Sequence, residues 1–382
     1  MADIEAIDGV AAADVEAVNG VAKANIQAIN GCGVPAAGAS LWCIAAEDGG
    51  IATAAGSDLN AWTGYVSADM AGTQDYMFLA YGKDGSGDPL WVCTSKNNNR
   101  EIRYSSDPTA GVDAWSDVNT ASNNNLLGAA WGNNVWVAVG ADGEVWRSTD
   151  GASWSLLDLS GVTGWSSSDN ADGIVTDGAG KWMFVQGTNV FLSTNDAATW
   201  ARVVDLSDAS HLNASGYTGS AMTYTASRWC VYVYKSGNTR FFHAAASDPT
   251  SWTASTYAGG YAVAARNIIH ESARRMAAGD GTVIIVGAND TSRSTDGGQD
   301  WTKRTNDLPR ADVRDVSTDG LGTWVAVHDS GFVSVSTNNG DSWAEQTGNN
   351  ASSGTRTRLS FPFNGTNVEN LETVAAAVYL PV

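Results

Sequence analysis

Short alternating runs of apolar and polar residues, each ended by a cluster of turn-forming residues, fill most of this chain. Four such runs follow one another in residues 125–159, namely "LLGAAWG", "VWVAVGA", "GEVWRST" and "WSLLDL". Alternation over about four to eight residues is typical of a β-strand with one buried face, and Gly, Asn and Asp between the runs are typical of tight turns. The pattern therefore predicts four antiparallel strands in this stretch and an all-β chain.

One turn recurs along the sequence. The segment "RSTDGASW" (147–154) has close copies in "LSTNDAATW", "RSTDGGQDW" and "VSTNNGDSW" and more distant ones elsewhere. Seven copies occur, 42 to 53 residues apart by subtraction of their residue numbers, and each ends in a tryptophan. Their Asp or Asn markers are Asp58, Asp107, Asp150, Asn195, Asp248, Asp296 and Asn338, and their tryptophans are Trp62, Trp115, Trp154, Trp200, Trp252, Trp301 and Trp343. A regular spacing of this length predicts a repeat architecture.

A second series of tryptophans lies upstream of the markers. It comprises Trp42, Trp91, Trp136, Trp182, Trp229 and Trp324, with Val283 in the remaining copy. A unit of about 45 residues with short strands has the size of one four-stranded propeller blade. The sequence thus predicts a seven-bladed β-propeller over residues 41–365, in which each repeated turn joins the third and fourth strands of a blade.

The two ends of the predicted ring differ from the other repeats. Only "VPAAGA" precedes Trp42, so the first blade lacks an innermost strand, whereas "TRLSFPF" (357–363) is an extended segment without a blade of its own. We expect 357–363 to supply the missing strand, because propellers avoid free sheet edges by closing the ring. Residues 366–382 are then a tail or an additional edge strand.

The amino-terminal segment, residues 1–31, has a different repeat. Copies begin at Asp3, Asp14 and Asn25, one every 11 residues, and each contains an Asx-Gly pair. An Asx cap, one helical turn and a glycine stop is the local structure expected from this pattern. A continuous coiled coil is disfavoured, because each glycine costs about 1 kcal/mol relative to alanine.

The apolar positions of this segment still need a partner surface. We therefore predict an oligomerisation or docking arm, followed by a linker at residues 32–40. Packing of the arm on its own propeller and disorder are the alternatives.

Charge and composition narrow the classes of partner. The formal net charge of −20 disfavours nucleic acid and anionic membranes, which repel an acidic surface. No apolar run approaches the ~18 residues of a membrane span, and "MADIEAIDGV" lacks the regions of a secretion signal. The four cysteines and four histidines show no metal-ligand spacing, so we expect neither a metal nor a cofactor, and buried free thiols at Cys43, Cys93 and Cys230.

The repeated turns resemble the Asp-box, also called the bacterial neuraminidase repeat, with the pattern Ser-x-Asp-x-Gly-x-Thr-Trp. Ser294, Asp296, Gly298 and Trp301 match it nearly in full, and three of the copies are degenerate. The resemblance covers residues 41–347 and implies a propeller fold. It implies no single activity, because Asp-boxes occur in sialidases, other glycoside hydrolases, sorting receptors, photosystem assembly factors and phage proteins.

A sialidase would need an arginine triad, an Asp acid/base and a Tyr-Glu pair. No arginine precedes Arg100, and Arg103, Arg147 and Arg293 recur just before repeated turns, which predicts equivalent peripheral positions rather than one convergent site. The 41 acidic residues offer many pairs of carboxylates, most of which we expect to lie in solvent. We nevertheless expect no enzymatic activity.

The arm is similar to the "INGVAKA" repeats at the starts of structural proteins of tailed phages. This resemblance implies a phage virion protein, assembled in the host cytoplasm. It would form a homo-oligomer or bind other virion proteins through the arm and display the propeller to a host-surface glycan or protein. A glycoside hydrolase and a cellular assembly factor are the alternatives. Trp131 and Trp165 lie outside both tryptophan series and are the candidates for stacking on a sugar.

Overall fold

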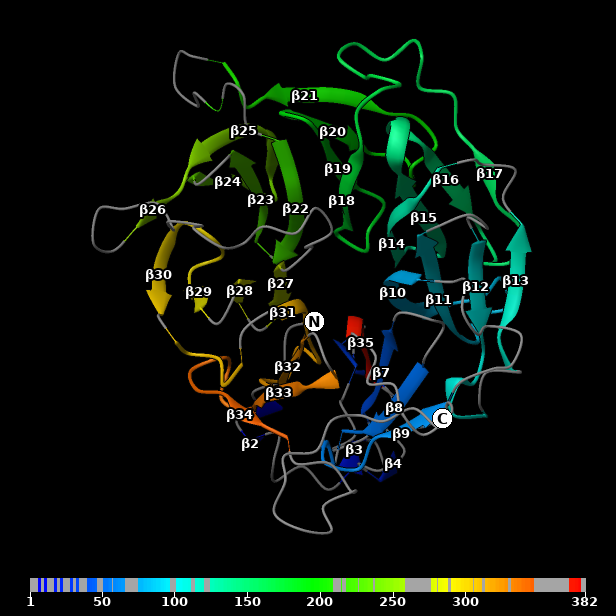
Figure 1. The fold of residues 1–382 in the computed structure, drawn as a ribbon, viewed down its shortest axis with the longest axis vertical. Helices are drawn as coiled ribbons and strands as arrows, with labels where there is room; N and C mark the ends of the chain where they lie inside the picture. Colours follow the sequence, from blue (N-terminus) through cyan, green and yellow to red (C-terminus); the bar gives the residue numbers. More distant parts are fainter. Residues whose placement is uncertain are drawn as a thin grey trace.

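The structure is a computed structural model, and it describes residues 6–7, 10–11, 17–18, 21–22, 28–29, 32–33, 40–46, 51–56, 58–65, 75–96, 101–110, 114–119, 124–208, 214, 218–225, 227–235, 238–257, 276–279, 281–287, 290–304, 306–310, 313–328, 331–346 and 371–378. In this part of the chain, six four-stranded sheets and one five-stranded sheet stand as a ring around a central axis (Figure 1). The fold is an all-β propeller.

Each blade is a meander of antiparallel strands that runs from the centre of the ring to its periphery. From the innermost strand outward, the four-stranded blades are β35 (Leu371–Val378), β7 (Ser40–Ala46), β8 (Ile51–Ala55) and β9 (Thr63–Tyr65); β10 (Asp75–Lys83), β11 (Pro89–Lys96), β12 (Glu101–Ser105) and β13 (Ser116–Asn119); β14 (Leu126–Gly132), β15 (Val135–Gly140), β16 (Val145–Ser148) and β17 (Ser155–Leu156); β18 (Ala171–Thr176), β19 (Trp182–Gln186), β20 (Asn189–Ser193) and β21 (Ala201–Asp205); β22 (Thr218–Thr225), β23 (Arg228–Lys235), β24 (Asn238–Ala245) and β25 (Asp248–Ala254); and β31 (Val313–Thr318), β32 (Trp324–His328), β33 (Val333–Ser336) and β34 (Ala344–Glu345).

The remaining sheet has five strands, so the structure has six four-stranded blades and not the seven that the sequence predicted. Its meander is β27 (Met276–Gly279), β28 (Thr282–Gly287), β29 (Asp290–Ser294) and β30 (Asp300–Arg304). The fifth strand, β26 (Thr256–Tyr257), comes from the end of the preceding blade and pairs in parallel with β30. The Thr256 N–H donates to the Gln299 carbonyl at 2.8 Å, which ties the two neighbouring blades together.

A carboxyl-terminal strand closes the ring, but it is not the segment that the sequence predicted. Strand β35 lies innermost in the first blade, antiparallel to β7, with Val378 opposite Ser40 and Leu371 opposite Ala46. The expected strand at 357–363 lies outside the described residues. The tail predicted at 366–382 therefore contains the closing strand. The inner edge of β7 is paired with β35, a strand far away in sequence, and is not left free.

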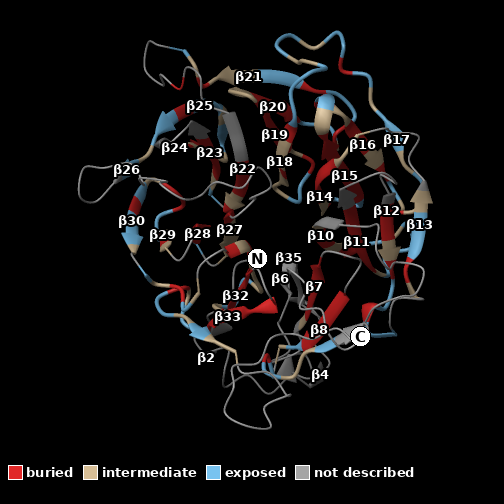
Figure 2. Ribbon diagram, viewed as in Figure 1, coloured by how far each residue is buried: buried red, intermediate tan, exposed pale blue. Residues whose placement is uncertain are grey.

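The hydrophobic core is divided among the interfaces between neighbouring blades. The second strands are buried along their whole described length in most blades, and the upstream tryptophans lie there with no exposed surface: Trp42, Trp91, Trp136, Trp182, Trp229 and Trp324. Each cluster of buried apolar residues combines side chains of two adjacent blades, as when Val325 and Val327 of β32 pack with Trp42 and Ile44 of β7. Exposed residues concentrate on the outermost strands (Figure 2). Stability therefore depends on contacts between blades more than on any one sheet.

The amino-terminal repeat forms β-hairpins, and the predicted helical turns are wrong. The three hairpins are β1 (Ala6–Ile7) with β2 (Val10–Ala11), β3 (Ala17–Val18) with β4 (Val21–Ala22), and β5 (Ala28–Ile29) with β6 (Cys32–Gly33). Two residues of sequence Asp-Gly or Asn-Gly separate the strands of each pair. This dipeptide favours the two-residue hairpin turn, because its backbone conformation needs positive φ at both residues. The last hairpin also extends into residues 32–33, which the sequence assigned to the linker.

Three cysteines lie in these inter-blade cores as free thiols: Cys43, Cys93 and Cys230. Burial raises the pKa of Cys230 to about 12 and raises the pKa values of Cys43 and Cys93 as well. Since the thiolate is the reactive form, native Cys43, Cys93 and Cys230 should resist thiol reagents at pH 8.

This expectation can be checked in a Cys32→Ser variant, which leaves only these three thiols. Labelling with a chromogenic disulfide should be negligible in the folded protein and should reach three equivalents after denaturation. Rapid labelling of the folded variant would contradict the burial of these thiols.

Candidate functional site

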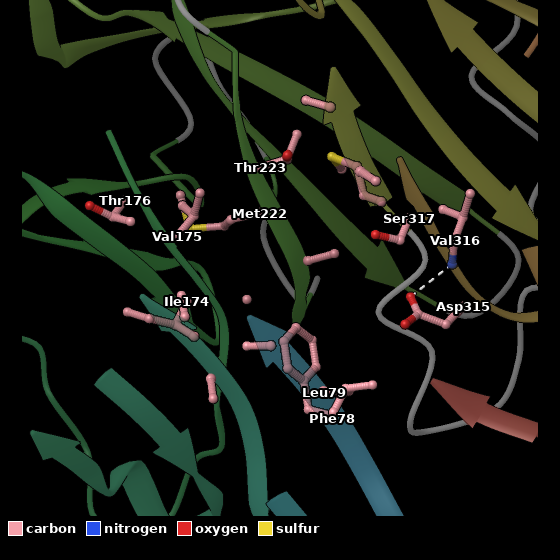
Figure 3. A pocket seen from close by; sticks show the side chains of 18 of the residues that line it. Phe78, Leu79, Ile174, Val175, Thr176, Met222, Thr223, Asp315, Val316 and Ser317 are labelled. Carbon is pink, nitrogen blue, oxygen red and sulfur yellow. Dashed lines mark hydrogen bonds between the residues drawn. The ribbon is translucent and has the colours of Figure 1, made fainter. Parts of the chain in front are cut away.

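The centre of the ring holds a cavity of about 430 Å³. Six innermost strands line it: β10, β14, β18, β22, β27 and β31 (Figure 3). Small residues create much of the space, because Ala80, Ala129, Ala221, Ala277 and Ala278 stand where large side chains would fill the axis. Its volume lies in the range of about 300–1,000 Å³ typical of small-molecule sites.

The wall combines apolar and aromatic side chains, Phe78, Tyr81, Trp131 and Met222 among them, with the hydroxyl residues Thr176, Thr223, Ser317 and Thr318. Asp315 is the one carboxylate among the described lining residues, and only 7% of its surface is exposed. Its Oδ1 accepts a hydrogen bond from the Val316 N–H at 2.8 Å. None of the described lining residues is an arginine, lysine or histidine, so this wall offers a ligand apolar contacts, hydroxyl groups and a single carboxylate.

The hydroxyl groups at one end of the cavity are engaged in turns of the chain. Thr176 Oγ1 donates to the Lys181 carbonyl at 2.9 Å, and Thr318 Oγ1 donates to the Thr323 carbonyl at 2.8 Å. Each hydroxyl also accepts an N–H, from Gly178 and Gly320 respectively. These two threonines therefore shape one end of the cavity. A ligand could hydrogen-bond to their hydroxyl groups only by displacing the bonds that they already make.

The two tryptophans proposed to stack on a sugar lie in different places. Trp131 lines the central cavity, and its ring packs so closely on Gly82 that a Cβ there would lie 2.2 Å from Trp131 Cγ. Trp165 donates its indole N–H to the Gly143 carbonyl at 3.0 Å and packs against the core between two blades. The structure does not bring them together in one site.

The seven markers of the repeated turns follow the third strands, one in each blade, and Asp248 is also the first residue of the fourth strand β25. Their side-chain oxygens accept backbone N–H groups two to four residues further along the chain; the markers are Asp58, Asp107, Asp150, Asn195, Asp248, Asp296 and Asn338. In four copies the closing tryptophan donates its indole N–H to the carbonyl three residues earlier: Trp62, Trp154, Trp252 and Trp301. Trp115, Trp200 and Trp343 pack in the same place without such a bond among the described residues. These residues stabilise the turns and do not converge on one point.

The hydrogen bonds of two of these turns predict how the stability of the protein changes with pH. Burial alone would raise the pKa of Asp296, but hydrogen bonds from the Asp300 N–H, the Ser294 hydroxyl and the Gln299 N–H outweigh it and lower the pKa. Asp150 has a lowered pKa for the same reasons, with bonds from Ser153, Ala152 and Ser148. A lowered folded pKa means that this stabilisation is present above the unfolded value of about 3.9 and is lost as the pH falls through the folded value.

We expect the double variant Asp150→Asn, Asp296→Asn to fold at pH 7 within ~1 kcal/mol of the parent, because Asn195 and Asn338 serve in the same position. Its urea midpoint should fall less steeply than that of the parent between about pH 5 and pH 2. An unchanged slope would show that the two carboxylates contribute nothing to the acid sensitivity.

Arg147 and Arg293 directly precede the serine of their turns and reach the turn of the next blade. Arg147 Nε donates to the Asp196 carbonyl at 2.8 Å, and Arg293 Nη1 pairs with Asp341 Oδ1 at 3.1 Å. Arg103 is not equivalent to them, which corrects the sequence interpretation: it lies two residues before Ser105, is buried, and pairs with Asp117 of its own blade at 2.6 Å. The three arginines therefore stabilise separate blades and do not form a carboxylate-binding triad.

The described histidines are also held by neighbouring hydroxyls. His328 is fully buried with Nε2 2.8 Å from Ser334 Oγ, and His243 Nδ1 lies 3.2 Å from Ser255 Oγ. Burial lowers the pKa of His243, and the Arg228 charge adds to the effect. His211 and His270 lie outside the described residues.

Among the described residues no group of three metal-ligating side chains occurs, and no helix is long and apolar enough to cross a membrane.

Comparison with known proteins identifies the fold. No family model and no curated protein matches the sequence. Among solved structures, the chain is similar to YCF48 from Cyanidioschyzon merolae (13% identity, TM-score 0.50, covering 72% of this chain and 85% of that one). It is also similar to YCF48 bound to D1 peptide (12%, TM-score 0.50, 72% and 82%) and to the WD40 β-propeller domain of Doa1 (12%, TM-score 0.52, 77% and 88%). The chain has a β-propeller fold.

These solved structures show the fold alone, and of the cavity residues the sequence pointed only to Trp131. Asp315, Phe78 and Met222 lie on innermost strands, and nothing in the strand pattern distinguished their positions from those of the other strands. The available signal was the accumulation of small residues in "LLGAAWG" and "MAAG", which marks strands crowded around an axis.

Proposed function

We propose that the protein is a non-enzymatic structural protein of a phage virion, which attaches through its amino-terminal arm and displays the propeller to a host-surface glycan or protein. The arm is the observation that carries this proposal. Three two-stranded hairpins, repeated every 11 residues, precede a ring that is already closed by β35. An isolated two-stranded hairpin is at best marginally stable in water. The hairpins therefore need a surface outside themselves, and further copies of the arm or another virion protein would supply it.

The ring supplies a rigid platform for binding. Its stability comes from inter-blade cores, and its central cavity presents apolar side chains and hydroxyl groups with one carboxylate. The similar structure described as YCF48 bound to D1 peptide is a propeller that holds a protein segment. By analogy of fold alone, this supports a binding role for the present ring.

The arrangement of arginines argues against the sialidase-like alternative. That chemistry requires arginines that meet at one carboxylate, whereas Arg147 and Arg293 each pair with the turn of a neighbouring blade. An active site would have to draw its cations from elsewhere in the chain.

Light scattering of the full chain and of a chain beginning at Ala37 tests the proposal. The shorter chain keeps β7, whose first residue is Ser40, and all the blades. We expect a multimer for the full chain and a monomer with an unchanged ring for the shorter one. Identical monomeric masses, together with failure of the arm to bind any virion protein, would remove the assembly role.

A further inference from the structure

A second cavity, of about 410 Å³, lies between two neighbouring blades near the periphery of the ring. One wall is the turn 84–88 between β10 and β11 together with Tyr104 and Ser105 of β12, and the other is the repeated turn around Asp150 in the next blade. The two turns lie against one another, since a Cβ on Gly85 would lie 3.5 Å from Asp150 Cβ. Leu90, Ser106, Ala114 and Ser116 also line the cavity.

Comparison with two other blades shows what differs beside this cavity. Two copies of the repeated turn have the sequence "RSTD", and the residue directly before the serine is Arg147 in one and Arg293 in the other. Each arginine crosses the interface between two blades and bonds to the repeated turn of the following blade. In the blade that contains "YSSD", this residue is Tyr104. A tyrosine has no cationic group to bond to the next turn, and the cavity lies beside it. The position that holds an arginine across the blade interface in two other blades is therefore an aromatic residue in this blade.

The cavity has acceptors, hydroxyls and an aromatic ring in fixed positions. Asp84 Oδ1 accepts the N–H groups of Ser86 and Asp88 at 2.8 and 2.9 Å. Asp150 Oδ1 accepts those of Ala152 and Ser153 at 2.9 and 2.7 Å. These bonds hold both carboxylates in fixed positions in the cavity wall, where their oxygens can accept further hydrogen bonds from a ligand.

Such a lining matches a neutral sugar better than other ligands. Sugar hydroxyls donate to carboxylates and exchange hydrogen bonds with serines, and the apolar face of a pyranose packs on an aromatic ring. Two carboxylates within a protein of net charge −20 repel acidic sugars such as sialic acid. An ammonium group would also pair with the carboxylates, but it would leave the serines and the tyrosine ring unused.

We propose that this inter-blade cavity, with Tyr104, Ser106, Ser116, Asp84 and Asp150, binds a neutral pyranose unit of a host-surface glycan. The inference rests on the proposed display function and names its ligand class and its site. Tyr104 provides the ring face, and the two carboxylates orient the sugar hydroxyls.

The test uses saturation-transfer NMR of the full chain with a panel of neutral methyl glycosides, with N-acetylneuraminic acid and a lysine peptide as comparison ligands. The matched variant is Tyr104→Arg, which restores the residue found in two other blades and should fold while it fills the cavity. Ser106→Trp, at an exposed residue, blocks the entrance independently. We expect at least one neutral glycoside to bind and both variants to weaken it by about tenfold or more, equivalent to ~1.4 kcal/mol.

Three results would overturn this inference. The first is the absence of binding by every neutral glycoside, and the second is a preference for the lysine peptide. The third is unchanged glycoside binding in both variants, which would place the sugar elsewhere, for instance in the central cavity beside Trp131. None of these results changes the arm-dependent mass expected from the virion role, so the two proposals fail separately.

Discussion

Substitution of Gly340 by alanine should lower the free energy of unfolding by about 2–5 kcal/mol. Gly340 has a φ of +71°, and a Cβ there would lie 2.0 Å from Ile284 Cδ1 of the preceding blade. The left-handed backbone costs an L-residue roughly 1–2 kcal/mol, and overpacking of a closed core adds roughly 1–3 kcal/mol. The effect is large because the repeated turn inserts directly into an inter-blade core.

Urea unfolding of three variants separates the two contributions. Gly320→Ala is the matched control, because its φ is +72° and no atom lies within 4 Å of its Cβ position. It should lose only about 1–2 kcal/mol. Combining Gly340→Ala with Ile284→Val should recover part of the overpacking cost, since valine lacks the methyl group that collides.

Another repeated turn of the protein already combines an alanine and a valine at the two corresponding positions. Ala197 occupies the corresponding place in another turn with a φ of +58°, and it packs in a cluster that contains Val137 of the preceding blade. Equal losses for Gly340→Ala and Gly320→Ala would contradict the argument, because the contact with Ile284 would then cost nothing.

Removal of residues 371–382 should abolish cooperative folding of the ring. Strand β35 is the innermost strand of the first blade and pairs with β7 along seven residue pairs. Its loss exposes the edge of β7 and opens the ring between β31 and β10, which both contact β35. We expect a loss of at least about 5 kcal/mol, the scale of the whole stability of many domains.

A chain ending at Val378 is the control, because it lacks only the residues beyond β35. Calorimetry should show one cooperative transition for the control and for the full chain, and none for the chain ending at Asn370. A normal transition in the shortest chain would show that another segment closes the ring.

The repeat was sufficient to predict the propeller from the sequence, and the errors occur where the repeat is interrupted. Trp136 and Asp150 mark their strand and turn because each copy meets the same inter-blade environment. β26 was not predicted, since two residues that pair in parallel with β30 have no pattern of their own. The closing strand was assigned to "TRLSFPF" because this segment has an extended pattern and no blade of its own. The strand that closes the ring, "LETVAAAV", is rich in alanine, which has low strand propensity. Small residues also recur in other innermost strands, where the blades crowd around the axis.

The amino-terminal hairpins show how one dipeptide can support two structures. Asx-Gly ends a helix and also forms a two-residue hairpin, and the 11-residue spacing is compatible with both. The arginines show a similar ambiguity. Matching the turn copies by residue type groups Arg103 with Arg147 and Arg293, whereas matching them by the serine of the turn puts Tyr104 at the position of Arg147 and Arg293. A strand side chain reverses its face with a shift of one residue, so this difference moved Arg103 to the opposite side of its blade.

Amide hydrogen exchange of the full chain at two protein concentrations, on the order of a hundredfold apart, tests the central claim most directly. If the arm is an assembly device, amides in β1–β6 are protected at high concentration and exchange rapidly on dilution, while the blades are unchanged. Protection of the arm that does not depend on concentration would mean that it packs on its own ring. Rapid exchange of the arm at both concentrations, with no change on addition of virion proteins, would contradict the account.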